Sequence, residues 1–593
     1  MSSAPARSVP LGAADVRSER RTDGSILLRS PHPLGAYSRC LTERLVHWAG
    51  VTPDRKFIAQ RDSSSAWRSL SYGQAHTRVR AIGQALLDRG LSAERPLAIL
   101  SDNDIEHALL ALACMHVGIA YVPVSSAYSL VSTDFAKLKQ VIGLLTPGLV
   151  YASDGARFAK AIGAAVPPDT EVLSGDRFAD LESTPATAAV EAAHAAVGPE
   201  TIAKFLLTSG STGWPKAVIN TQRMLCSNQQ MLTQSLPSLR QAPPVLVDWL
   251  PWNHTAGSNH NLGLVLNHGG TLYIDEGKPV PDLIEKTVRN LREVGPTIYF
   301  NVPRGYEALL PFLRDDALLR ETFFSRLGLL QYAAAVLPQP IWQAYEELAI
   351  QTCGERILWI TGYGATETAP AAMFTNRGAA RAGTVGLPVD GVEMKLAPVD
   401  GKLEARFRGP SITPGYWRQP ELTRTAFDEE GYYRTGDALR FVDPADARHG
   451  FEFDGRTTED FKLGTGTWVS VGPLRAKVNA ACSPLVQEVV ITGHGRDRLG
   501  ALVFPNLLIC RDLGPEVLRA RLQPLLERLA QDATGSSTRV VRALVMDQPP
   551  SIDAGEVTDK GSINQRAVLA NRAALVERLY AEPPDPSIIV ASP

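Results

Sequence analysis

Residues 204–221 read KFLLTSGSTGWPKAVINT, and the rest of the chain is best interpreted from this stretch outward. Its apolar arms, Phe205–Leu207 and Ala217–Ile219, predict short buried strands, and the glycines and proline between them predict a turn. Glycines allow backbone N–H groups to approach a phosphate closely, while hydroxyls and a lysine add donors and positive charge. The loop therefore indicates a phosphate site, although a polar surface turn is the alternative for such a loop alone.

The candidate phosphate ligands of this loop are Thr208, Ser209, Gly210, Ser211, Thr212, Gly213 and Lys216. The loop is not a Walker A motif, because that motif needs glycine before the lysine and Ser or Thr after it. Pro215 and Ala217 occupy those two places here. A phosphate site of another type is predicted.

The bulk properties are those of a globular enzyme of several domains. The chain has 593 residues, a net charge of −2 and six cysteines without a CxxC pair. A net charge so close to zero does not indicate a basic surface for nucleic acid. Cysteines without a CxxC pair are expected to be reduced, which is typical of a cytoplasmic protein. The longest apolar run, 108–124, contains Pro123 and falls short of the ~20 residues of a membrane span. We therefore expect a cytoplasmic protein without stable membrane insertion, either a monomer or a homodimer.

Apolar strands alternate with helical patterns along most of the chain. Strands are expected at 97–100, 120–124, 148–152, 246–250, 271–274, 297–302, 327–330 and 357–360. This alternation predicts an α/β fold with parallel sheets, to which 383–408 adds a small β-rich subdomain. A smaller α+β domain follows. The expected divisions are a loose tail at 1–32, a large N-terminal domain at 33–455, a mobile C-terminal domain at 456–582 and a disordered tail at 583–593.

Two further motifs carry chemistry. One is Tyr363, Gly364, Ala365, Thr366, Glu367 and Thr368, just after a predicted strand. Loops at the carboxyl ends of parallel strands tend to face a ligand, and here a tyrosine ring, a hydroxyl and a carboxylate suit a base, a phosphate and Mg²⁺. The other is Tyr433, Arg434, Thr435, Gly436 and Asp437, followed by Gly455 and Arg456. A carboxylate such as Asp437 can accept from both hydroxyls of a ribose.

The strings TSGSTGxPK, YGATE and YRTGD, in this order and followed by GR, resemble the adenylate-forming (AMP-binding) superfamily of acyl- and aryl-CoA synthetases. The resemblance implies ATP, Mg²⁺ and coenzyme A as its small molecules. It places Thr366 at the α-phosphate as a catalytic residue, Glu367 at the metal, Asp437 at the ribose and Arg456 at the hinge. It further implies that Ala334 and Ala335 back the adenine and that His254, in WLPWNH, borders the acyl pocket and gates it.

The C-terminal domain departs from the family pattern. Relatives carry the catalytic lysine directly after a glycine, where this chain has Ser562. We assign the role to Lys560, which stands two residues earlier and is the only lysine in this loop; a solvated loop lysine is the alternative. The hinge position is likewise open, because Thr458 stands where many relatives have lysine or aspartate. By resemblance, this domain rotates between two steps, and the loop with Gly466 and Trp468 lines a channel for CoA.

The strings at 458–475 and 558–569 look most like the feruloyl-CoA synthase branch of the superfamily. The predicted function is an ATP-dependent ligase that joins an aryl carboxylate, such as ferulate, caffeate or p-coumarate, to CoA through an acyl-AMP. A fatty acyl-CoA synthetase or another adenylate-forming ligase is the alternative within enzymes. An inactive nucleotide-binding homologue is the alternative outside them. We expect no peptide-synthetase carrier segment after Leu579.

Overall fold

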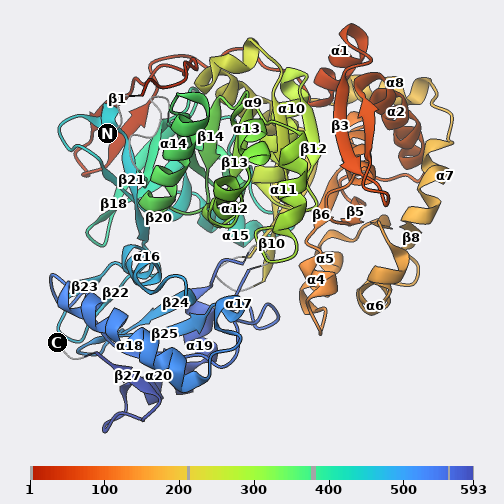
Figure 1. The fold of residues 1–593 in the computed structure, drawn as a ribbon. Coiled ribbons are helices and arrows are strands. Elements are labelled where there is room, and N and C mark those ends of the chain that lie inside the picture. The colour runs from red at the N-terminus through yellow and green to blue at the C-terminus, as the bar shows by residue number, and fades with distance from the viewer. Residues whose placement is uncertain (1–3, 210–213, 376–381, 559–560, 592–593) are drawn as a thin grey trace.

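The computed structural model describes residues 4–209, 214–375, 382–558 and 561–591. Three sheets and their helices form a large N-terminal domain, and a small α+β domain lies below it in the view of Figure 1. This is the predicted α/β class with a separate C-terminal unit. Helix α16 (Val471–Cys482) lies next to β21 (Phe451–Arg456), so the two domains meet near the second half of the N-terminal domain.

A six-stranded sheet contains the opening stretch of the sequence. Its order is β10-β9-β6-β5-β7-β8, and its bounds are Pro215–Thr221, Ile202–Ser209, Tyr121–Val124, Leu97–Leu100, Leu149–Ala152 and Glu171–Ser174. All neighbours are parallel except β10, which pairs antiparallel with β9. The inner strands are buried along their full length because helices cover both faces, which explains their continuous apolar sequence.

The longest sheet has eleven strands and joins parallel and antiparallel parts. Its parallel end consists of β13 (Ile298–Asn301), β14 (Leu329–Tyr332) and β15 (Leu358–Gly364). The antiparallel part continues through β16 (Ala371–Phe374), β17 (Thr384–Pro388), β21, β20 (Tyr433–Phe441), β19 (Lys402–Arg408) and β18 (Glu393–Val399). A third sheet is formed by β11 (Val245–Asp248), β12 (Thr271–Ile274), β3 (Lys56–Arg61) and β4 (Trp67–Ser71).

The N-terminal residues are not a loose tail throughout, as the sequence suggested. Residues Arg17–Arg20 (β1) and Ile26–Arg29 (β2) form a hairpin, and β2 adds to the edge of the long sheet beside β18. Leu28 is fully buried there. Pairing with a strand more than 360 residues away, Leu28↔Met394, orders the segment, and composition alone does not reveal such a partner.

The helices of the N-terminal domain cover these sheets (Figure 1). Their bounds are α1 Thr42–Val51, α2 Tyr72–Asp88, α3 Ile105–His116, α4 Ala127–Leu130, α5 Ala136–Leu145, α6 Gly155–Ala165, α7 Phe178–Glu182, α8 Ala188–Ala196, α9 Gln222–Ser235, α10 Gly263–His268, α11 Ile284–Glu293, α12 Pro303–Asp315, α13 Ala317–Phe324, α14 Gln339–Cys353 and α15 Pro420–Ala426. Helix α3 is buried on all sides, as its apolar sequence requires.

The C-terminal domain is built on a four-stranded sheet, β24-β25-β26-β27. Its bounds are β24 Val486–Thr492, β25 Leu499–Pro505, β26 Val540–Val545 and β27 Ile588–Val590; its helices besides α16 are α17 Leu507–Cys510, α18 Pro515–Gln531, α19 Gln565–Asn571 and α20 Ala573–Tyr580. The expected disordered tail is therefore wrong for 588–590, because buried Ile588 and Ile589 pair this segment with β26.

One lysine of β9 is buried in the six-stranded sheet. The exposed fraction of Lys204 is 2%, and its Nζ lies 5.6 Å from the centroid of the Tyr121 ring. Burial lowers the pKa of Lys204 to about 7. Among the described residues, no carboxylate lies within ion-pair distance of it.

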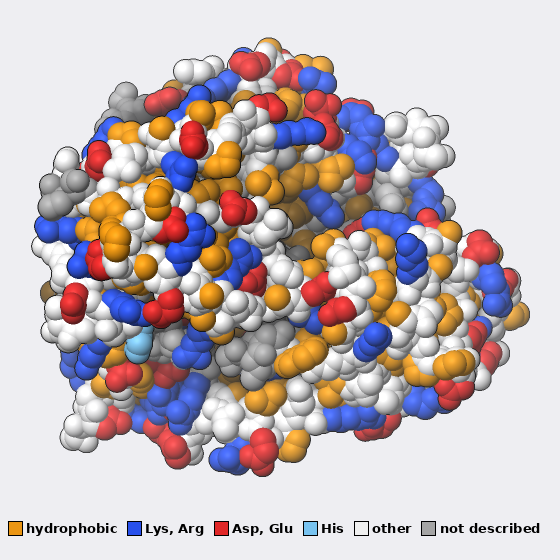
Figure 2. All heavy atoms as spheres, turned by 90° about the horizontal axis from the view of Figure 1, so that it is seen from below, with side chains coloured by type: hydrophobic (Ala, Val, Ile, Leu, Met, Phe, Trp, Pro, Cys, Tyr) orange, Lys and Arg blue, Asp and Glu red, His pale blue; other side chains and the backbone are white. Residues whose placement is uncertain are grey.

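The surface has mixed charge. Acidic and basic side chains are interspersed over the face that Figure 2 shows, without a large area of one sign, in keeping with a net charge of −2. Within the described part of the chain, no helix is both long and apolar enough to cross a membrane.

Candidate active site

The predicted phosphate loop joins β9 and β10, with Thr208 opposite Lys216 and Ser209 opposite Pro215. The expected strands are thus present on both sides of the loop. Gly210, Ser211, Thr212 and Gly213 lie outside the described residues, as does the side chain of Ser209. Only Thr208 and Lys216, both half-buried, can be placed with their side chains.

Lys216 is held over an aromatic ring that the sequence motifs did not include. Its ammonium lies 5.0 Å from the centroid of the Tyr416 ring. Tyr416 is placed there because its segment runs beside β10: Ile219 N donates to Gly415 O at 3.1 Å and Trp417 N donates to Ala217 O at 2.9 Å. The cation–π contact fixes the lysine at the base of the loop.

Tyr416 also joins this lysine to the acidic residue of the second motif. Its hydroxyl donates to Glu367 Oε1 at 3.0 Å. Glu367 is 7% exposed and lies in a short 3₁₀ turn, Thr366–Thr368, directly after β15. The backbone is fixed as well, because Thr413 N donates to Glu367 O at 2.8 Å. A cation and a buried carboxylate therefore flank one tyrosine, an arrangement suited to a phosphate and its counter-ion.

The Thr366–Thr368 turn depends on the glycine before it. A Cβ on Gly364 would lie 1.7 Å from Pro370 O, so no other residue fits without backbone movement. Ala365 N donates to Thr368 Oγ1 at 2.9 Å, which shapes the turn and leaves Thr366, at 6% exposure, beside Glu367.

The third motif meets the second through Tyr363 and Asp437. The Tyr363 hydroxyl donates to Asp437 Oδ2 at 2.7 Å, and Arg456 Nε lies 3.4 Å from Asp437 Oδ1. Asp437 and Arg456 face each other on β20 and β21. Burial raises the pKa of Asp437, while Arg456 and Tyr363 oppose that rise. Since Oδ1 accepts no hydrogen bond from the described residues, it has capacity for a ligand hydroxyl.

Ala334 and Ala335 follow β14, one strand over from the YGATET loop. Both are exposed, and Ala334 has a φ of +73°, a left-handed conformation in which a small side chain is favoured. Since β13, β14 and β15 are parallel, the turn after β14 and the loop after β15 lie at the same edge of the sheet.

His254 lies between β11 and an unusual helix. It is half-buried, and its Nδ1 accepts from Ala256 N at 3.2 Å. The following residues, Ala256–Leu262, form a π-helix, a feature that often occurs at functional sites.

The same π-helix contributes a histidine that the sequence motifs missed. The Nε2 atom of His260 lies 3.1 Å from Gln331 Nε2, and the Nδ1 atom of His260 lies 2.8 Å from Asn261 Oδ1. Because an amide nitrogen only donates, Nε2 accepts and Nδ1–H donates. Burial lowers the pKa of His260 to about 4, so it is neutral at neutral pH. The run Ser258–Asn261, polar inside an apolar stretch, was the available signal.

The C-terminal site residues stand apart from this cluster. Gly466 takes a φ of +83° in the turn between Phe461–Lys462 (β22) and Trp468–Val469 (β23). Trp468 is 44% exposed, and Lys462 Nζ lies 5.0 Å from its ring centroid. No described contact joins either residue to Lys216 or Glu367, and Lys560 lies outside the described residues.

Within the described ranges, no three His, Cys, Asp or Glu side chains gather as a metal site. A single buried carboxylate nevertheless fits Mg²⁺, which is commonly bound by one or two carboxylates together with substrate phosphates. Glu367, with only Oε1 bound by Tyr416, meets that requirement.

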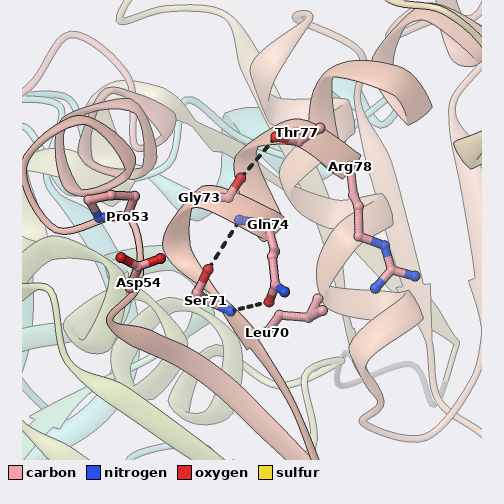
Figure 3. A pocket seen from close by; sticks show the side chains of 8 residues that line it. All are labelled: Pro53, Asp54, Leu70, Ser71, Gly73, Gln74, Thr77 and Arg78. Atoms are coloured by element: carbon pink, nitrogen blue, oxygen red, sulfur yellow. Dashed lines mark hydrogen bonds between the residues drawn. The ribbon is translucent and has the colours of Figure 1, made fainter.

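A depression of about 490 Å³ lies at the start of α2, and its lining includes none of the site residues described above (Figure 3). Two of its polar side chains are used in capping, since Gln74 N donates to Ser71 Oγ and Ser71 N donates to Gln74 Oε1. Arg78, which also lines the depression, is paired with Glu182. Thr77 donates to Gly73 O in the same turn. The depression is therefore explained by the local helix structure.

Comparison with known families assigns most of the chain. A family model described as "AMP-binding enzyme" matches residues 45–417, and one described as "AMP-binding enzyme C-terminal domain" matches residues 461–583. The first range contains the Lys216, Tyr416 and Glu367 cluster.

Individual relatives are distant. The carboxylic acid reductase of Segniliparus rugosus is 26% identical over 457 residues, which cover 72% of this chain and 36% of the reductase. The chain thus spans about a third of that relative's length. The 3-hydroxybenzoate–CoA ligase of Aromatoleum sp. is 27% identical over 475 residues, covering 74% of this chain and 82% of the ligase. The solved anthranilate CoA ligase AuaEII, in complex with anthranoyl-AMP, superposes with a TM-score of 0.71 at 20% identity and covers 92% of this chain and 99% of its own. At that identity the likeness establishes the fold alone.

Proposed function

Because the chain belongs to the AMP-binding enzyme family, we propose that it is an ATP-dependent acid–CoA ligase that acts on an aryl carboxylate. The observation that carries the proposal is the cluster of Lys216, Tyr416 and Glu367, 3.0 Å between the tyrosine and the carboxylate, beside the Tyr363–Asp437 pair. The three sequence motifs that would serve triphosphate, metal and ribose thus lie in one continuous region of the N-terminal domain.

The first step makes the acid reactive. A carboxylate oxygen attacks the α-phosphorus of ATP, the bond from that phosphorus to the bridging oxygen breaks, and pyrophosphate leaves. Two anions must meet, so positive charge and fixed donors lower the barrier most. Lys216 and the loop after β9 bind the terminal phosphates, Thr366 donates to the α-phosphate, and Asp437 accepts from the ribose hydroxyls. Lys560 bridges the carboxylate and the α-phosphate.

Glu367 would hold Mg²⁺, which when bound offsets phosphate charge. The Tyr416 hydroxyl orients the Glu367 carboxylate by its hydrogen bond to Oε1. The mixed anhydride then reacts with the CoA thiol: a carbon–sulfur bond forms, the acyl carbon–oxygen bond breaks, and AMP leaves. The loop of Gly466 and Trp468 lines the route of the thiol.

An aryl acid with a polar substituent suits the surroundings of the π-helix. His260 and Gln331 are both about 3% exposed and hydrogen-bonded to each other, and Gln331 Oε1 has no partner among the described residues. A buried polar atom of this kind favours a substrate that brings a hydroxyl to it. Hydroxycinnamates such as ferulate, caffeate and p-coumarate have that character, and two of the compared proteins are named for substituted benzoates.

Transfer to another acceptor is the second candidate, since a carboxylic acid reductase is among the relatives. The test is to incubate the protein with ATP, Mg²⁺ and an acid panel, with and without CoA. Ferulate, caffeate, p-coumarate, benzoates and long-chain fatty acids form the panel, and pyrophosphate, AMP and thioester are measured. The proposal predicts thioester with aryl acids; adenylate that is never passed to CoA would contradict it.

Lys560 is tested separately. Lys560→Ala is expected to lower acid-dependent pyrophosphate release at least 100-fold while thioester formation from presynthesised acyl-AMP persists. Lys160→Ala, an exposed lysine on α6, is the matched control. Unchanged pyrophosphate release in Lys560→Ala would remove this residue from the mechanism.

A further inference from the structure

A loop of the C-terminal domain is hydrogen-bonded to the N-terminal domain at two successive residues. Thr133 N and Thr133 Oγ1 both donate to Asp553 Oδ2, at 3.0 and 2.8 Å. Lys137 Nζ donates to Ile552 O, one residue earlier in the loop. These contacts, together called the 552–553 dock, join segments more than 400 residues apart.

The Lys137–Ile552 contact of the dock is partly buried, whereas the hydrogen bonds from Thr133 to Asp553 are exposed. Lys137, at the start of α5, is 7% exposed. The Ile552 side chain packs on the hydrophobic cluster that contains Leu207 and Ala217, which are the residues at the base of the β9–β10 hairpin. Helix α5 and β10 lie on the side of the N-terminal domain that faces the C-terminal domain (Figure 1). The loop thus packs on the same hydrophobic cluster as the hairpin that carries Lys216.

The N-terminal side of the dock is shaped in advance. Phe135 has a φ of +56°, an unfavourable conformation for a large residue. Hydrogen bonds hold the turn in this form, because Phe135 N donates to Ser132 Oγ at 3.1 Å and Ala136 N donates to Asp134 Oδ1 at 2.8 Å. The turn presents Thr133 to the loop, and its strain points to a specific role.

The C-terminal side is also braced. Arg572 Nη2 lies 2.7 Å from Glu556 Oε2, and these side chains are 12% and 4% exposed. The same guanidinium donates to Gln548 O at 3.0 Å and to Pro549 O at 2.9 Å. Because these bonds tie the loop to the rest of the C-terminal domain, a contact at Asp553 fixes the orientation of that whole domain.

The charge of Asp553 suits this role. Burial opposes ionisation of its carboxyl, but the hydrogen bonds from Thr133 and the nearby Lys137 ammonium outweigh burial and lower its pKa. The groups that face it from the N-terminal domain are donors and a cation, and Asp134 forms its own bonds to Ser132 Oγ and Ala136 N.

We propose that Asp553, bound by Thr133 next to the Lys137 contact with Ile552 O, is a positioning residue for acid activation: the 552–553 dock holds the C-terminal domain beside the phosphate hairpin during adenylate formation and is released for thiol transfer. This inference rests on the proposed function, in which the two steps use different domain orientations. It requires no contact between Asp553 and substrate. Its effect reaches the reaction through the orientation of the domain.

The test separates the two half-reactions. Asp553→Asn removes the charge but keeps the shape, and Thr133→Val removes one donor. Each is expected to lower acid-dependent ATP–pyrophosphate exchange by about 10-fold or more, while thioester formation from presynthesised acyl-AMP stays within about 2-fold of wild type. Asp532→Asn, an exposed aspartate after α18, should change neither.

Thermal unfolding and the second half-reaction report whether the variants fold. Equal losses in both half-reactions indicate a purely structural contact and overturn the inference, as does unchanged exchange in Asp553→Asn. Wild-type protein without acid-dependent exchange for any acid overturns the proposed function and the inference with it. The two failures are therefore distinguished by the wild-type control.

Discussion

Replacing Lys204 with methionine is expected to stabilise the N-terminal domain at neutral pH. The lysine side chain is 2% exposed, and its lowered pKa, about 7 instead of 10.5, arises from burial alone. Methionine is unbranched and of similar length, so it can follow the same path beside the Tyr121 ring without a charge. The variant has no ammonium group, so folding no longer costs the free energy of deprotonating or desolvating one.

The pKa displacement sets the magnitude. A shift from 10.5 to about 7 corresponds to roughly 5 kcal/mol, at ~1.4 kcal/mol for each pH unit. The folded-state pKa lies below the unfolded-state value, so between these two values the unfolded chain binds a proton that the folded chain does not. Wild-type stability therefore rises with pH across this window. The advantage of Lys204→Met should fall from roughly 5 kcal/mol near pH 6 to roughly 1 kcal/mol near pH 9.5.

Thermal unfolding of both proteins at several pH values is the assay. At an unfolding entropy of roughly 2 cal/mol/K per residue, one kcal/mol moves the Tm of a domain of roughly 400 residues by about 1 °C, so the expected difference is about 5 °C near pH 6 and about 1 °C near pH 9.5. Lys160→Met, on the exposed face of α6, should show no such trend. A Lys204→Met protein less stable than wild type near pH 6, or a difference independent of pH, would refute the reasoning.

Three further substitutions test the site and the C-terminal domain. Asp437→Asn should raise the KM for ATP about 10-fold or more, because the charged acceptor that Tyr363 and Arg456 surround is lost; an unchanged KM would argue against the ribose role. Tyr416→Phe should weaken Mg²⁺ binding during adenylate formation, because the hydrogen bond that orients the Glu367 carboxylate, worth about 2 kcal/mol, is lost. A Mg²⁺ titration of activity should then require a higher Mg²⁺ concentration. Arg572→Ala should destabilise the C-terminal domain by roughly 3–5 kcal/mol, since Glu556 is left buried without its cation. Calorimetry would show this as a lower Tm, and Arg572→Lys should lose less; equal stability of Arg572→Ala and wild type would contradict the expectation.

Local patterns predicted the parts of the site that are continuous in sequence. The arms of the phosphate hairpin, the strand before YGATET and several other strands, among them β5, β7 and β12, follow directly from apolar runs and turn residues. Residues that reach the site from elsewhere were missed. Tyr416 carries no motif of its own, and its position depends on backbone pairing with β10.

Long-range pairing also explains the two errors at the chain ends. β2 and β27 are short and lie in segments of polar or proline-rich composition, so only their partners β18 and β26 make them strands. The contact between His260 and Gln331 has the same origin, since it joins a π-helix to a strand 71 residues away. The spacing of apolar residues indicates whether a segment forms a helix or a strand, but it does not show which other segment that strand pairs with.

The β1–β2 hairpin has a practical consequence for anyone who prepares this protein. A shortened chain that begins at Pro33 would lack the strand that covers β18, and the backbone donors and acceptors of residues 393–396 that now pair with β2 would be left free. Such an open edge is a template for association between molecules. A chain chosen for expression should therefore start before Arg17, and an affinity tag placed there should be joined through a spacer that leaves the hairpin intact.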